Sequence, residues 1–221
     1  MLENYNNSKM KQYDDAQWFL NRTSINIDLS HRCPLECPRC QRQMDWRDRG
    51  EKVPGYDITM SEIEKLAKFY TKFHFCGQLS DPIHHPKFAE ILKFLYDKKI
   101  DAIVHNASSH KPKDYYIKCF KAHPLARWVF GIDGLPEQSH NYRIHQDGKK
   151  LFNIMLEARK ILRYVPVWQY IIFDYNEHNV EEAKEMAAEN DVAIMFTQSS
   201  RWKTNKDTLK PKNKEFLNAL V

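Results

Sequence analysis

The sequence predicts an α/β fold, and more narrowly an incomplete (β/α)6 barrel that resembles part of a TIM barrel. Six short apolar segments, rich in β-branched and aromatic residues, alternate with segments of helical periodicity, which is typical of parallel strands joined by helices. The chain has 221 residues, fewer than the roughly 250 of a complete eight-fold barrel. The carboxyl ends of parallel strands meet at one edge of a sheet, where we expect the functional loops.

Six segments are expected to form the strands. The first, residues 23–29 (TSINIDL), alternates polar and apolar side chains and includes β-branched residues. The later strands are shorter apolar runs bounded by turn residues, and they are expected at residues 73–76, 101–105, 127–132, 165–175 and 192–196.

Six helices are expected between and after these strands. In residues 61–73 the apolar side chains recur at helical spacing, and Ser61 is the predicted N-cap. Residues 86–96 begin with proline, which suits a first helical turn. The remaining helices, which include an apolar face on 149–162 and a Glu- and Ala-rich segment, are expected at residues 112–122, 149–162, 180–190 and 211–220.

Composition and charge indicate a cytoplasmic globular protein with no membrane span. The mean hydropathy is −0.69, and no run approaches about 18 consecutive apolar residues. The polar N-terminus lacks the apolar centre of a secretory signal. Of the net charge of +5, +4 lies in residues 201–221, which indicates a solvated basic tail and gives no support for a nucleic-acid surface. We expect an extension (1–22), one core domain (23–200) and a C-terminal tail with a helix (201–221); the oligomeric state is not indicated.

Three of the five cysteines lie together in HRCPLECPRCQ, on the loop after the first predicted strand. An odd number of cysteines without a secretory signal favours metal binding over disulfides. Cys33, Cys37 and Cys40 are spaced to wrap one centre. The spacing is compatible with a [4Fe–4S] cluster that has one open iron, or with a zinc site in which His31 is the fourth ligand. Unliganded cysteines are the third possibility.

Further motifs at the later strand ends make the resemblance more specific. With Cys33-x3-Cys37-x2-Cys40, residues 23–200 resemble the radical S-adenosylmethionine (radical SAM) superfamily, above all its short members similar to molybdenum-cofactor-synthesis proteins, several of them phage-encoded. The other motifs that carry the resemblance follow the second, third and fourth strands: FCGQLSDPIHHP (75–86) for the Gly-Gly-Glu-Pro element, HNASS (105–109) for Thr-Asn-Gly, GIDG (131–134) for Ser-x-Asp-Gly, and HNYRIHQDGKKLFNIM (140–155).

The resemblance implies an enzyme with a [4Fe–4S] cluster on the three cysteines. In this superfamily, S-adenosylmethionine (SAM) binds the open iron, and an electron cleaves it to a 5′-deoxyadenosyl radical that abstracts hydrogen from a substrate. It implies an electron donor such as flavodoxin or ferredoxin, and a substrate that the sequence does not identify: a small molecule, nucleotide or peptide. The alternative is a zinc- or cluster-binding interaction or sensor module without turnover. Only two further cysteines are present, which disfavours members with auxiliary clusters.

The resemblance also implies SAM contacts. Gly77 and Gln78 belong to the loop by the methionine moiety, Asp81 stands where the family has a glutamate for the SAM ammonium, and Arg143 is suited to its carboxylate. The remaining expected contacts to ribose, adenine or substrate are Asn106, Asp133, Gln169 and Arg39.

Several of these residues also have purely structural interpretations. Asp81 precedes Pro82 and is suited to capping a turn, Asp133-Gly134 is a common turn dipeptide, and Arg143 is equally suited to a salt bridge. Two departures from the family affect the predicted contacts. Arg39 replaces an aromatic residue, and Gln78-Leu79-Ser80-Asp81 replaces a tighter glycine-rich loop.

Overall fold

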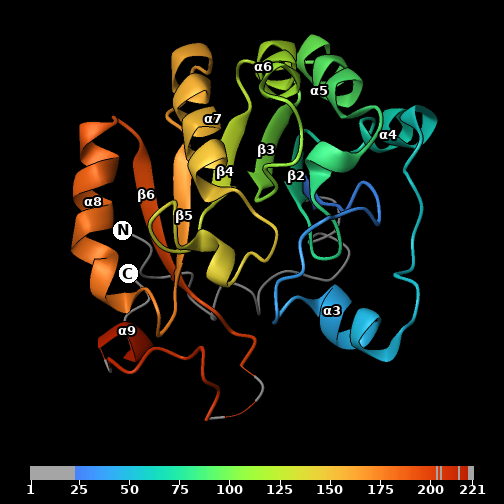
Figure 1. Cartoon of the computed structure of the whole chain (residues 1–221). Coiled ribbons are helices and arrows are strands. Elements are labelled where there is room, and N and C mark those ends of the chain that lie inside the picture. Colours follow the sequence, from blue (N-terminus) through green and yellow to red (C-terminus); the bar gives the residue numbers. More distant parts are fainter. Residues whose placement is uncertain (1–22, 203, 205, 214, 219–221) are drawn as a thin grey trace, which may run out of the picture.

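The sheet contains six parallel strands in sequential order, β1-β2-β3-β4-β5-β6 (Figure 1). The structure is a computed structural model that describes residues 23–202, 204, 206–213 and 215–218. The strands are β1 (Ser24–Asn26), β2 (Lys72–Cys76), β3 (Asp101–Asn106), β4 (Arg127–Gly131), β5 (Val167–Ile172) and β6 (Ala193–Gln198). β1 and β6 form the two edges, so the predicted incomplete (β/α)6 barrel is confirmed.

A helix follows each strand. Most of these helices pack along the outer side of the sheet, whereas the first and the last lie beyond its carboxyl-terminal end (Figure 1). The α-helices are α3 (Gln41–Asp45), α4 (Met60–Leu66), α5 (Phe88–Asp97), α6 (Lys113–Ala122), α7 (Gly148–Ile161), α8 (Val180–Glu189) and α9 (Glu215–Asn218). Short 3-10 helices occupy Arg47–Arg49, Pro82–His84, Ser139–Asn141 and Glu177–Asn179. Within the described part of the chain, no helix combines the length and apolar character needed to cross a membrane.

Several local predictions differ from the structure. The N-cap of α4 is Thr59 rather than Ser61, because the Thr59 hydroxyl accepts from the Glu62 backbone N–H while the Glu62 carboxylate accepts from the Thr59 N–H. Helix α3 and the Arg47–Arg49 turn lie in a polar stretch for which the sequence predicted no helix. β5 covers Val167–Ile172, a shorter span than the predicted 165–175.

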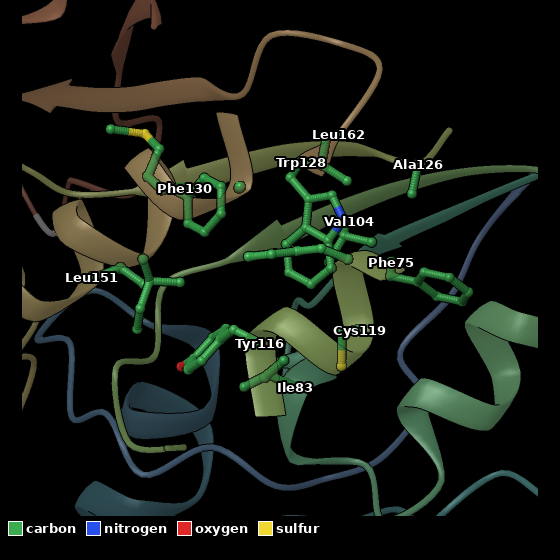
Figure 2. Close-up of a cluster of buried hydrophobic side chains, with 14 of the residues drawn as sticks. Phe75, Ile83, Val104, Tyr116, Cys119, Ala126, Trp128, Phe130, Leu151 and Leu162 are labelled. Atoms are coloured by element: carbon green, nitrogen blue, oxygen red, sulfur yellow. The ribbon is translucent and has the colours of Figure 1, made fainter. Parts of the chain in front are cut away.

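The core lies between the sheet and the helices, where large aromatic side chains fill the space (Figure 2). Trp128 on β4 stacks on Phe130 at 5.8 Å between ring centroids and meets Phe120 of α6 edge-on at 4.7 Å. Tyr116 and Cys119 of α6 are fully buried in the same cluster. This packing fixes the strands and therefore the positions of the loops that leave them.

The inner face of the sheet is less buried and more polar than the outer face. Along β2, β3 and β5 buried residues alternate with half-buried ones. The half-buried positions include His74, Cys76, His105 and Gln169. The barrel interior therefore offers polar side chains below the carboxyl-terminal edge.

Candidate functional site

A cavity of about 470 Å³ lies at the carboxyl-terminal edge of the sheet. Its walls come from the loop after β1, the loop after β2, the ends of β3 to β5 and the segment after β6. Nine of the eleven residues expected in the site line it: Cys33, Cys37, Cys40, Gly77, Gln78, Asp81, Asn106, Arg143 and Gln169. Arg39 and Asp133 are not among the lining residues.

The three cysteines of the β1 loop lie on one wall of this cavity as free thiols. The Cys40 backbone N–H donates to the Cys37 carbonyl at 2.9 Å, which closes the turn between them. Burial raises the pKa of the Cys33 thiol to about 12 and also raises the pKa of Cys37. A metal centre has to displace these protons, because the thiolate is the ligand form.

The described residues contain no group of three His, Cys, Asp or Glu side chains placed to hold a single metal ion. Each cysteine of a [4Fe–4S] cluster binds a different iron atom, so such thiolates lie further apart than the ligands of one ion. His31, the fourth ligand in the zinc interpretation, has its Cβ beside Gly55, and it does not line the cavity.

Arg42 is a buried residue of this wall that the sequence did not single out. It lies on α3, is 4% exposed, and its Nη1 donates to the Cys33 carbonyl at 2.8 Å. Its Nε has no hydrogen-bond partner, and among the described residues no carboxylate forms an ion pair with it. A buried cation therefore lies at the base of the cysteine loop. Its signal in the sequence was its position two residues after Cys40.

The loop after β2 is held by two carboxylates. Asp28, beyond the end of β1, accepts hydrogen bonds from the backbone N–H groups of Gln78 (3.0 Å) and Ser80 (3.1 Å), and from the Ser80 hydroxyl. A Cβ on Gly77 would lie 1.6 Å from the Ser80 carbonyl oxygen, so the loop requires glycine there. The close packing of the loop on itself therefore explains why residue 77 is glycine.

Asp81 joins this loop to the end of β3. One carboxylate oxygen accepts from Ile83 N–H, and the other accepts from the N–H groups of Ala107 and Ser108, both at 2.8 Å. The side chain is buried, and burial raises its pKa despite these bonds. The carboxylate that was expected to receive the SAM ammonium thus already has three backbone donors, which agrees with the turn-capping interpretation of Asp81.

Asp133 and Arg143 form a buried ion pair. Arg143 Nε donates to Asp133 Oδ2 at 2.6 Å, and Asp133 Oδ1 accepts from the Ile171 N–H. Burial acts to lower the pKa of Arg143, but Asp133 raises it above its ordinary value. Burial raises the pKa of Asp133, and the Arg143 charge acts against that shift. Nη1 of Arg143 lies 4.0 Å from Cys37 Sγ. Arg143 therefore faces the cysteine wall while Asp133 holds it from behind.

Asn106 and Gln169 reach the cavity from β3 and β5. Asn106 is 1% exposed and donates to the Ser108 carbonyl, whereas its Oδ1 has no partner. Gln169 contacts His105, and burial lowers the pKa of that imidazole.

Arg39 lies outside the cavity, where it forms a bidentate ion pair with Asp207 at 2.8 and 2.9 Å. The guanidinium that was expected to stack on adenine is therefore engaged by the C-terminal segment. No signal in the sequence links two residues so far apart along the chain.

Comparison with known proteins identifies the fold. No protein-family model matches the chain, and no curated protein matches it. Among solved structures, Streptococcus suis SuiB bound to S-adenosylmethionine superposes with a TM-score of 0.67 at 10% identity, covering 87% of this chain and 44% of SuiB. SuiB bound to its precursor peptide SuiA gives a TM-score of 0.65 at 11% identity, covering 87% of this chain and 42% of SuiB.

Methylornithine synthase (PylB) superposes with a TM-score of 0.63 at 14% identity, covering 89% of this chain and 60% of PylB. This chain therefore spans less than half of SuiB and about three fifths of PylB. At these identities the likeness shows a common fold, in which almost the whole described chain takes part.

Proposed function

We propose that this protein is a radical SAM enzyme in which Cys33, Cys37 and Cys40 hold a [4Fe–4S] cluster and SAM binds in the same cavity. The observation that carries the proposal is the presence of three free thiols of one loop on one wall of a cavity at the carboxyl-terminal edge of an incomplete barrel. A solved protein with this fold, SuiB, binds SAM, which supports the choice of cofactor.

The donors on this wall suit such a cluster. Three thiolates leave one iron open, and two guanidinium groups, Arg42 and Arg143, lie beside the cysteine loop. Positive charges near thiolates favour their ionised form: Arg42 acts to lower the pKa of Cys33 and Arg143 that of Cys37, although burial keeps both pKa values above the ordinary value. When bound, the cluster supplies the electron that cleaves SAM and so starts radical chemistry on the substrate.

The residues of the chain position the cofactors and exclude water. Leu35, Tyr142 and Phe173 form a small apolar cluster around the cysteine loop, and Tyr142 packs on Phe173 at 4.3 Å between ring centroids. Asp28 and Asp81 fix the β2 loop, which we propose lies against SAM.

We assign the catalytic core to residues 23–200 and propose an unidentified substrate together with an external electron donor of the flavodoxin or ferredoxin type. Gln169 and Asn106 are proposed to contact SAM or substrate, since each directs polar groups to the cavity. Residues 1–22, the expected extension, lie outside the described residues.

The test is anaerobic reconstitution followed by measurement of iron, sulfide and reductive SAM cleavage. We expect a brown protein with about four irons per chain that forms 5′-deoxyadenosine in the presence of dithionite. The Cys37→Ala variant should lose both the cluster and cleavage, because Cys37 is a buried thiol on the cavity wall.

The matched control is Cys119→Ala, which removes a thiol from the helical core at a distance from the cavity lining. It should keep its iron and its SAM cleavage. Retention of a cluster by Cys37→Ala would contradict the ligand assignment. Zinc in place of iron after anaerobic purification would favour the binding module without turnover.

A further inference from the structure

The segment that leaves β6 forms a polar wall of the cavity opposite the cysteine loop. Five consecutive residues, 197–201 (TQSSR), all line the cavity. Four carry neutral hydroxyl or amide groups and the fifth is Arg201, so the segment is rich in hydrogen-bond donors and contains no acid. The cysteines follow one edge strand and this segment follows the other, so the two walls face each other across the open side of the barrel.

Part of this wall has no partner within the protein. Thr197 Oγ1 and Gln198 Nε2 are both buried, and neither has a hydrogen-bond partner among the described residues. Leaving a buried polar atom unpaired costs on the order of 1–3 kcal/mol. Thr197 lies opposite Ile171, which also lines the cavity, so its unpaired hydroxyl is on the cavity side of β6, whereas Gln198 lies opposite the core residue Ile172.

The guanidinium of Arg201 is held in place but not neutralised. Its Nη2 donates to Gln78 Oε1 at 2.5 Å, and its backbone N–H donates to the Ser199 hydroxyl at 3.1 Å. Among the described residues, no carboxylate forms an ion pair with it. The lining carboxylate, Asp81, already accepts three backbone donors.

These observations indicate which chemical group would bind to residues 197–201. A guanidinium forms two parallel charge-assisted bonds with a carboxylate or phosphate, which are stronger than its single bond to a neutral amide. The neighbouring hydroxyl and amide groups can donate to the remaining oxygens. We propose that residues 197–201 bind an anionic group of the substrate, so that the substrate is a molecule bearing a carboxylate or a phosphate. The statement that the anion belongs to a substrate rests on the proposed function. The existence of the anion site does not.

The test measures protection of individual arginines from phenylglyoxal, read by peptide mass spectrometry on the reconstituted full-length protein. Parallel reactions contain no addition, saturating SAM alone, or saturating SAM with either inorganic phosphate or acetate. We expect phosphate or acetate to slow modification of Arg201 several-fold beyond SAM alone. The two anions distinguish a phosphate-bearing from a carboxylate-bearing substrate. Arg49, an exposed residue paired with Glu51, is the internal control and should react equally in all arms.

Calorimetric titration with the preferred anion provides the second measurement. Arg201→Gln should weaken binding of the anion at least about tenfold. Arg201→Lys should weaken it less, because lysine keeps the charge but cannot form two parallel hydrogen bonds. Arg49→Gln should bind as the unmodified protein does. If neither anion protects Arg201 beyond SAM alone, the inference is overturned, because Arg201 would then bind SAM or only hold the loop after β2. Protection in a protein that fails to cleave SAM would support the anion site and contradict the proposed function.

Discussion

At the scale of single residues, three carboxylates determine the shape of the cavity, and two of them, Asp81 and Asp133, are buried. Asp28 gathers the N–H groups of the β2 loop, Asp81 links that loop to β3, and Asp133 orients Arg143 toward Cys37. In each case the carboxylate is a strong acceptor that replaces several hydrogen bonds to water. The cavity walls therefore depend on acids that need not touch any ligand.

Replacing Asp28 should destabilise the protein through the β2 loop. In Asp28→Ala the Gln78 and Ser80 N–H groups and the Ser80 hydroxyl lose their acceptor. We expect the free energy of unfolding to fall by about 1–3 kcal/mol, measured by urea denaturation. Asp48→Ala, at an exposed position in the Arg47–Arg49 turn, should change it by less than about 0.5 kcal/mol. Equal effects of the two changes would show that the loop does not depend on Asp28.

At the scale of elements, the chain after β6 packs back onto the cysteine loop. Asp207 pairs with Arg39, the Trp202 ring meets Phe173 at 6.0 Å, and the Leu209 carbonyl accepts from Asp174 N–H. Figure 1 places this C-terminal segment at the same end of the sheet as α3. The expected solvated tail is therefore, over these residues, a strap docked beside the cavity.

Weakening the ion pair should loosen this strap. Asp207→Asn leaves Arg39 without a charged partner although the side chains are largely buried, which disfavours the docked segment. Trypsin should then cleave after Lys206 several-fold faster under native conditions, as followed by mass spectrometry. The matched change Asp174→Asn removes a more exposed pair with Lys212 and should leave the cleavage rate almost unchanged. A similar rate in Asp207→Asn and the unmodified protein would show that the pair does not hold the strap.

At the scale of the whole molecule, burial keeps many histidines neutral. Burial lowers the pKa of His84 to about 4, and it also lowers the pKa of His74, His85, His105, His110 and His123. The unfolded chain binds a proton on each near pH 6.5. Between these values the unfolded state holds more protons, so acid shifts the equilibrium toward unfolding.

The histidine contribution to the free energy of unfolding should therefore fall as the pH drops from about 6.5 to about 4, and the raised pKa values of Asp81 and Asp133 act in the opposite direction. Each such histidine contributes a slope of at most about 1.4 kcal/mol per pH unit, and the contribution is fully present above pH 6.5. Urea denaturation across this range measures it. His84→Gln keeps a group that can hydrogen-bond to the Ser108 hydroxyl but does not titrate, so the pH dependence of this variant should be shallower. An unchanged slope in this variant would contradict the burial of His84 as a neutral group.

The order of strands and helices was predictable, because period-two and helical patterns are local properties of the chain. The cysteine loop was predictable for the same reason, since Cys33, Cys37 and Cys40 are close in sequence. The N-cap at Thr59 and helix α3 were missed, because a polar stretch can satisfy its backbone in several ways.

The sequence by itself determined an incomplete (β/α)6 barrel and a three-cysteine loop at the end of its first strand. Only the tertiary structure decided which polar side chains share the cavity and which are occupied elsewhere. Arg39 is held by Asp207, Arg143 by Asp133, and Asp81 by three backbone groups, whereas Arg42 and Arg201 face the cavity without an acidic partner among the described residues. The physical reason is that ion pairs join residues that are distant in the chain, and their partners are fixed only when the strands are assembled.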